Sequence, residues 1–148
     1  MFGRGQGINY GGIPKLLAPE ISLGGNFVYD TNGQYYSTTT IYGYIKYNDV
    51  NTSYETLLSI MNSSLCWWFL KNTGTVLANG YFRYKPTYLF PFPLPKISET
   101  EDYFLQKQVK DLMKETDDSI KEKLQNRINK FIYKLYGLNY NEIEIIEK

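Results

Sequence analysis

Three prolines at every second position constrain the fold of this chain more than any other feature. Residues 88–96 read YLFPFPLPK, in which the prolines alternate with Phe92 and Leu94. Proline lacks an amide hydrogen and has a fixed φ, so this segment cannot be the interior of a helix or a central strand. The spacing also differs from the P-x-x-P of polyproline ligands, and we expect Phe92 and Leu94 to be buried. The pattern predicts a stiff extended segment that leaves the edge of a sheet.

The chain differs in composition on the two sides of this segment. Residues 1–96, the aromatic part, hold 19 of the 25 aromatic residues, with seven Lys/Arg against four Asp/Glu. Residues 97–148, the helical part, hold nine Lys/Arg against eleven Asp/Glu. A length of 148 residues is typical of one domain, so we expect the two parts to form one unit.

The opening of the chain carries little regular structure. FGRGQGINYGGIPK is rich in glycine and has no hydrophobic period, which predicts a loop and indicates a piece of a larger protein. The glycines are not followed by the Gly-Lys-Ser/Thr of a phosphate-binding loop. No run approaches the roughly 18 apolar residues that a membrane span needs, and the single Cys66 fits a reducing compartment. We therefore expect a cytoplasmic protein with no membrane partner.

Four segments of the aromatic part have the composition of strands. They are rich in β-branched and aromatic residues and are separated by turn-forming residues. Asn32-Gly33 is a strong turn signal, which predicts that the second and third of these segments form a hairpin. The predicted strands are 15–22, 26–30, 35–47 and 80–90.

One helix is predicted between the third and fourth strands. Thr52 and Glu55 have the spacing of a capping box, apolar residues then recur at helical intervals, and Gly74 ends the pattern. We expect this helix to be the core element beneath the sheet, with Trp67 and Trp68 as packing residues.

The helical part predicts a hairpin of two helices and a short terminal helix. Capping-box patterns begin at Ser98, Ser119 and Asn139, and Gly137 ends the second helix. The polar connection 115–119 is short enough to make the first two helices antiparallel. The predicted fold class is therefore α+β, a small mixed and mostly antiparallel sheet with one core helix, followed by a C-terminal helical hairpin and a short terminal helix.

The motifs of several enzyme classes are missing. The chain has no histidine, which excludes histidine acid–base chemistry and histidine-ligated zinc. It has no Glu-x-Lys nuclease tripeptide and no Asn/Asp/Ser-Pro-Pro-Tyr/Phe of amino-methyltransferases. Asp117 and Asp118 lie in a helix connection, where capping is the expected role. We expect this chain to have no catalytic site and no metal site of its own.

A set of cationic, amide and aromatic side chains at predicted strand and helix ends is the best candidate for a binding surface. Arg and Lys contact phosphates or guanine, and Asn pairs with adenine, so these residue types suit double-stranded DNA. Scattered surface residues without a function are the alternative. The candidates are Tyr35, Tyr36, Lys46, Tyr47, Asn48, Lys71, Asn72, Arg83, Tyr84 and Lys85.

The order of several motifs resembles a known family. IPKLLAPEIS, NFVYDTNGQYY, LLSIMNSSLCWWFL, YFRYKPTYLFPFPLPKI and INKFIYKLYGLNYNEIEIIE occur here in sequence. Together they resemble the TaqI-like C-terminal specificity domain, the target-recognition region of single-chain restriction–modification enzymes and related N6-adenine DNA methyltransferases. The resemblance implies that this piece selects a short DNA sequence for an N-terminal methyltransferase domain. S-adenosylmethionine, and Mg²⁺ if the parent also cleaves DNA, would then belong to other domains.

Two other function classes remain open from the sequence. The helical hairpin could dock on a partner subunit, which would make the chain a protein–protein interaction module. The tyrosines and asparagines could instead bind carbohydrate, although the helical part and the resemblance disfavour this.

Overall fold

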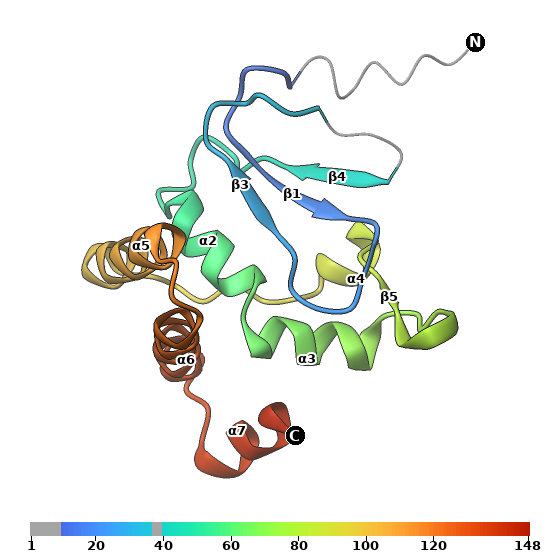
Figure 1. Cartoon of the computed structure of the whole chain (residues 1–148), viewed down its shortest axis with the longest axis vertical. Coiled ribbons are helices and arrows are strands. Elements are labelled where there is room, and N and C mark those ends of the chain that lie inside the picture. Colours follow the sequence, from blue (N-terminus) through green and yellow to red (C-terminus); the bar gives the residue numbers. More distant parts are fainter. Residues whose placement is uncertain (1–9, 37–39) are drawn as a thin grey trace.

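The computed structural model describes residues 10–36 and 40–148 and confirms the α+β class (Figure 1). Most of the glycine-rich opening therefore lies outside the described residues, as do residues 37–39 of the predicted strand 35–47. The described aromatic part contains two small antiparallel sheets, and three helices form the helical part. Helix α2 lies between the larger sheet and helix α5.

The larger sheet has β1 (Lys15–Pro19) at its centre. Strands β3 (Val28–Asp30) and β4 (Ile41–Tyr44) both pair with it in antiparallel fashion, in the order β3-β1-β4. The predicted hairpin between β3 and β4 is therefore wrong, because β1 takes the place between them. The predicted turn is present, since Gly33 has a φ of 64° and its carbonyl accepts a hydrogen bond from the Gly12 amide at 2.9 Å.

The side chains of β1 alternate between the two faces of this sheet, as strand geometry requires. Leu16 and Ala18 are buried in the core. Lys15 lies on the opposite face, directly across from Asp30, and the two form a buried ion pair with an N···O distance of 3.0 Å. The loop that holds Tyr10 and Ile13 covers this pair, because both of their carbonyls accept from the Lys15 ammonium.

The smaller sheet pairs β2 (Ile21–Ser22) with β5 (Phe82–Arg83). Strand β5 follows a 3₁₀ turn, η1 (Ala78–Gly80), and is far shorter than the predicted strand 80–90. The rest of that prediction is wrong, because the short helix α4 (Pro86–Leu89) follows β5. Proline at the first position of a helix is favoured, since its fixed φ suits the helix and its missing amide hydrogen is not needed there.

The predicted helix over 52–74 is two helices, α2 (Tyr54–Met61) and α3 (Ser64–Thr73). The chain breaks at Asn62, whose side-chain amide accepts from the Phe27 amide at 2.8 Å and donates to the Phe27 carbonyl at 2.9 Å.

The observed caps of α2 and α3 agree only in part with the predicted ones. The box between Thr52 and Glu55 is wrong, since Ser53 caps α2. Gly74 is confirmed as the C-cap of α3. Trp67 and Trp68 are partly buried against the core, as predicted.

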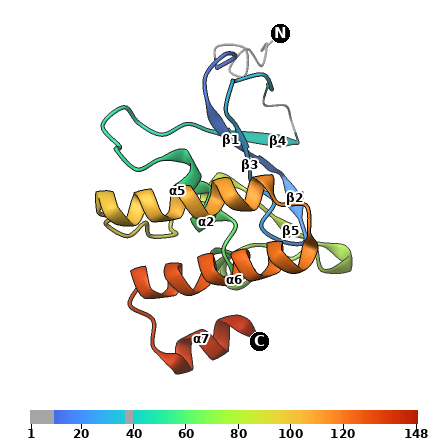
Figure 2. The same ribbon diagram turned by 60° about the vertical axis from the view of Figure 1, so that its left-hand side comes forward.

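Helices α5 (Glu99–Lys114) and α6 (Asp118–Leu135) form the predicted antiparallel hairpin, and α7 (Tyr140–Glu147) follows (Figure 2). The capping boxes at Ser98 and Asn139 are confirmed. The box at Ser119 is wrong, because Asp117 caps α6 through bonds from the amides of Ser119 and Ile120. This matches the capping role expected for the Asp117–Asp118 pair.

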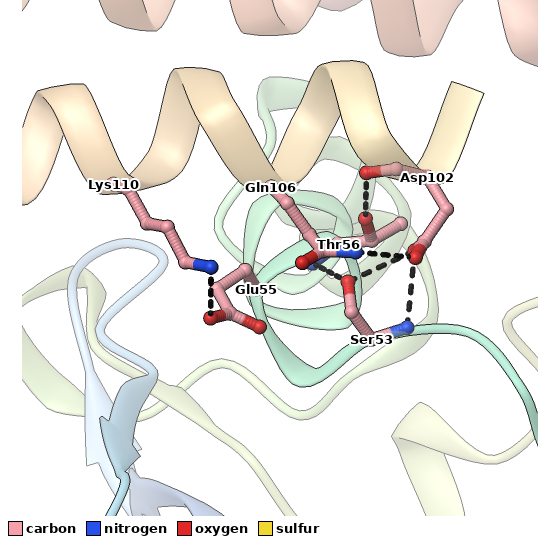
Figure 3. Close-up of polar contacts among 6 residues, drawn as sticks. All are labelled: Ser53, Glu55, Thr56, Asp102, Gln106 and Lys110. Atoms are coloured by element: carbon pink, nitrogen blue, oxygen red, sulfur yellow. Dashed lines mark hydrogen bonds and ion pairs between the residues drawn. The ribbon is translucent and has the colours of Figure 1, made fainter. Parts of the chain in front are cut away.

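The helical part holds the N-terminus of α2. Figure 3 shows Asp102 of α5 accepting from both the amide and the hydroxyl of Ser53, at 3.0 and 2.9 Å. About two helical turns further along α5, Lys110 forms an ion pair with Glu55 at 3.5 Å. Burial alone would raise the pKa of Asp102, but hydrogen bonds from Thr56, Ser53 and Gln106 hold it below its usual value.

The N-terminus of α3 is held in the same way by α6. The Asn129 side chain accepts from the Ser64 amide at 3.3 Å and donates to the Ser64 hydroxyl at 3.0 Å. Helices α2 and α3 of the aromatic part are thus anchored at their N-termini by polar groups of the helical part.

Only part of the prediction for residues 88–96 is right, because Tyr88 and Leu89 end helix α4, Phe90 and Pro91 form a turn, and residues 93–96 lie outside helices and strands. Phe92 is buried between the rings of Phe69 and Tyr136, and the Tyr136 hydroxyl donates to the Pro93 carbonyl at 2.8 Å. Leu94 is 52% exposed, which corrects the expectation that it is buried.

Candidate nucleic-acid interface

The candidate DNA-binding residues separate into groups on opposite sides of the molecule. Lys46, Tyr47 and Asn48 follow β4, in the segment that leads to α2. The Lys71 group, consisting of Lys71, Asn72, Arg83 and Lys85, lies at the C-terminal end of α3 and around β5. Figure 1 places the segment after β4 far from the end of α3, and Figure 2 places it far from β5.

The Lys71 group is brought together by the return of the chain after α3. The Arg83 amide donates to the Thr75 carbonyl at 3.4 Å, which places β5 beside the end of α3. Lys71 and Asn72 are exposed in the last turn of α3, and the Asn72 side chain donates to the Trp68 carbonyl at 2.7 Å. Lys85 is half-buried at the N-cap of α4.

Arg83 has a loosely held guanidinium. Its Nε atom lies 3.7 Å from a carboxylate oxygen of Glu20 and forms no hydrogen bond with any residue that the structure describes. The side chain is 37% exposed, so its terminal nitrogens can reach an acceptor outside the chain. Such a guanidinium can form the paired hydrogen bonds with which arginine recognises guanine or phosphate.

Tyr84 is a core residue, which corrects its place among the candidates. It is 1% exposed, packs edge-on against Phe27, and stacks on the ring of Trp67. Its hydroxyl donates to the Gly24 carbonyl at 2.6 Å. Burial raises the pKa of this phenol, and the side chain has no surface from which to contact DNA in this structure.

The ammonium of Lys46 is engaged within the chain. It donates to the Val50 carbonyl at 3.1 Å and to the Thr52 carbonyl at 2.9 Å, and it lies 5.5 Å from the centre of the Tyr54 ring. These contacts close the loop before α2. Tyr47 and Asn48 at the tip of this loop are exposed, and Tyr47 is 82% exposed.

Tyr35 and Tyr36 are exposed and follow the turn at Gly33. Their backbone is held by Asp30, whose carboxylate accepts from the amides of Gln34 and Tyr35 at 2.9 Å each. Burial alone would raise the pKa of Asp30, but hydrogen bonds from the Tyr35 amide, the Lys15 ammonium and the Gln34 amide lower it. The buried ion pair therefore also supports the loop that presents the two tyrosines.

The structure adds residues that the sequence analysis did not single out. Beside Lys71, a groove of about 550 Å³ is lined by Trp67 of α3 and by Asn126, Asn129 and Lys130 of α6. Asn126 and Lys130 are four positions apart, which places them on one face of a helix. That spacing is visible in the sequence, but only the packing of α6 on α3 places this face beside Lys71.

The remaining chemistry of the described residues is limited. Within residues 10–36 and 40–148, no three carboxylate or thiol side chains gather closely enough to hold a metal ion. Cys66 is buried, and burial raises the pKa of its thiol to about 12. No helix in the described ranges combines the length and the apolar composition that a membrane span requires.

The described part of the chain is an α+β domain that presents exposed cationic, amide and aromatic side chains at its strand and helix ends, and these residue types can contact DNA. The sequence pattern of the TaqI-like C-terminal specificity domain matches residues 3–94, more than half of the chain. The chain belongs to this family. This family supports a role in DNA specificity in restriction–modification enzymes. A comparison with curated proteins found no match.

The family match ends at Leu94, close to the end of the proline segment. The resemblance of the helical part to the same family lies outside the matched residues and stays a prediction. The division of the chain into 1–96 and 97–148 is likewise still a prediction.

Proposed function

We propose that this chain reads a short sequence of double-stranded DNA for a separate, N-terminal adenine N6-methyltransferase domain. The observation that carries the proposal is the family match together with the Lys71 group on the matched part, in which Lys71 and Asn72 are exposed and Arg83 and Lys85 are partly exposed. S-adenosylmethionine, and Mg²⁺ if the parent cleaves DNA, would bind to other domains. We place the protein in the cytoplasm, where DNA is accessible and Cys66 stays reduced.

Within this proposal the Lys71 group reads the bases. It combines a guanidinium suited to guanine, an amide suited to adenine and two ammonium groups suited to guanine or phosphate. These four side chains lie on adjacent elements, so one duplex can meet them together. The other exposed candidates lie outside the Lys71 group and are Tyr35, Tyr36, Tyr47 and Asn48. They would contact only DNA that extends beyond the base pairs read by the Lys71 group.

The test is selection of bound duplexes from a pool with a randomised centre, using the 148-residue chain. We expect one enriched motif. Asn72→Ala or Arg83→Ala should relax the preference at single positions, because a bidentate contact contributes about 1–3 kcal/mol of discrimination. Lys114→Ala, at the exposed end of α5, is the matched control and should leave the motif unchanged.

Exchange of the segment 71–87 for that of a relative with another specificity should change the motif. The exchange has to keep Phe82 and Tyr84, because Tyr84 is part of the core and Phe82 packs edge-on against Trp67. An unchanged motif in a folded exchange variant would exclude this segment as the reading loop.

A protein–protein role is the second candidate, and a specific surface favours it. The sheet face away from the core leaves Val28 61% exposed and Tyr35 62% exposed, next to Leu17 and Ile41. The helical hairpin, in contrast, places Leu105, Val109, Ile128 and Ile132 in the core of this chain. A partner protein would therefore dock on the sheet face.

This candidate predicts binding to the methyltransferase domain that Val28→Glu weakens. Arg83→Ala and Lys85→Ala should leave that binding unchanged. Equal loss of partner binding in all three variants would argue against a separate docking face.

A further inference from the structure

The groove beside Lys71 lies where three helices meet. Its walls come from α3, from α6 and from the end of α7, so the aromatic and helical parts both contribute to it. Figure 2 shows α7 on the side of α6 that faces away from α5. None of its α6 or α7 residues lies within the residues matched by the family.

The groove has an excess of positive charge. Lys71, Lys130 and Lys148 contribute three ammonium groups, and Glu147 contributes one carboxylate. Among the described residues, none of these three lysines has a carboxylate oxygen within 4.0 Å. The ammonium groups are solvated and exposed, which leaves them available to an anion.

The walls of the groove are held in place by contacts within the chain. Trp67 stacks on buried Tyr84 with 6.2 Å between ring centres and meets Phe82 edge-on at 5.2 Å. The two hydrogen bonds between Asn129 and Ser64 fix α6 against α3. Lys71 and Lys130 are therefore presented from two rigid helices rather than from loops.

We propose that this groove binds the phosphate backbone of the duplex whose bases the Lys71 group reads. The proposal rests on the proposed function, because Lys71 belongs both to the groove and to the base-reading group. Lys130 and Lys148 neutralise backbone phosphates, and the Asn126 amide donates a hydrogen bond to a phosphate oxygen. The helical part thereby binds the DNA backbone and fixes the position of the protein along the duplex. The aromatic part determines the sequence preference.

The test compares variants of the full chain for binding to the selected duplex and to a scrambled duplex across a range of salt concentrations. Lys130→Ala should weaken both complexes equally, by about two- to fivefold, as expected for one surface ion pair. The slope of log K against log salt should become shallower by about 0.9, the contribution of one phosphate contact. The enriched motif should stay that of the wild type.

Two further variants protect this test against effects of misfolding. Glu147→Gln removes a carboxylate from the lining of the groove, so it should tighten binding to both duplexes, which an unfolded variant could not do. Lys107→Ala, at an exposed position of α5, should behave as the wild type.

The outcomes separate the two proposals. A sequence-specific wild type with Lys130→Ala and Glu147→Gln indistinguishable from Lys107→Ala would overturn the groove proposal and leave the proposed function standing. A wild type that enriches no motif would overturn both. Inorganic phosphate alone, at matched ionic strength, should not shift the NMR signal of the Lys130 ammonium; a saturable shift would assign the groove to a small anion instead of DNA.

Discussion

Tyr84 and Tyr47 carry the same side chain but have opposite surroundings. Tyr84 is 1% exposed and Tyr47 is 82% exposed. Both stand next to a cationic residue in an aromatic-rich segment, so their neighbours in the sequence do not separate them. The difference arises from Phe27 and Trp67, which enclose the Tyr84 ring, and from Gly24, whose carbonyl accepts its hydroxyl.

We expect Tyr84→Phe to lower the free energy of unfolding by about 1 kcal/mol, the net contribution of one hydrogen bond. Chemical denaturation of wild type and variant measures this difference. Tyr47→Phe is the control and should leave stability unchanged, because the Tyr47 side chain is in solvent. The DNA motif selected by folded Tyr84→Phe should match that of the wild type. A changed motif would show that Tyr84 contributes to DNA recognition.

Asp102 makes the stability of the fold sensitive to acid. Its pKa is lowered in the folded chain, so the stability it contributes is present above the unfolded pKa of about 4 and is lost as pH falls through the folded value. Thermal unfolding measured between pH 6 and pH 2.5 should show Asp102→Asn losing less stability on acidification than the wild type. Asp111→Asn, an exposed change on the same helix, should follow the wild type. Equal acid sensitivity of all three proteins would exclude this role for Asp102.

Helix ends were the most predictable elements of this chain. Ser98 with Glu101, Asn139 with Glu142, and the stops at Gly74 and Gly137 involve groups within about one helical turn, and the structure confirms all four. The wrong caps at Thr52 and Ser119 have a common reason. In each, another capping residue lies within two positions, and the capping-box pattern does not rank the competitors.

The proline segment shows that alternation in the sequence does not define burial where the chain is not extended throughout, since Phe90 has helical backbone angles at the end of α4. Phe90 is 75% exposed and Phe92 is 6% exposed, although both are phenylalanines beside Pro91. Phe92 fits between Phe69 of α3 and Tyr136 at the end of α6, and so joins the aromatic part to the helical part.

Phe92→Ala should therefore lower the free energy of unfolding by about 3–5 kcal/mol, through lost burial and the cavity left behind. Phe90→Ala is the matched control and should change it by no more than about 0.5 kcal/mol, as is typical of exposed positions. Urea denaturation followed by tryptophan fluorescence measures both. Similar losses for the two variants would contradict the assigned role of Phe92.

The aromatic and helical parts share one core. Leu58, Ile60 and Leu70 pack in the same buried cluster as Leu105 and Ile132. The polar contacts of Asp102 with Ser53 and of Asn129 with Ser64 add to this joint surface. The family match ends near the boundary, but the packing continues across it.

Residues 1–96 expressed alone should therefore lack a cooperative thermal transition and show poorly dispersed NMR amide signals. Removing 97–148 would expose the apolar faces of α2 and α3 and leave their N-termini without the contacts of Asp102 and Asn129. Addition of a peptide spanning 97–148 should restore a folded spectrum. A fragment 1–96 that unfolds cooperatively with full-length stability would show that the helical part is an independent domain.

The sequence alone determined the α+β class, the helical hairpin and the types of side chain suited to DNA, because each depends on patterns that span a few neighbouring positions. It also determined the family, through the order of several such motifs along the chain. The β3-β1-β4 order, the burial of Tyr84 and the approach of Lys130 to Lys71 do not follow from such patterns, because they depend on which distant segments pack together. The turn at Gly33 reverses the chain but does not determine which strand pairs with β3. The pairing depends on burial of apolar surface, which involves side chains from the whole length of the chain.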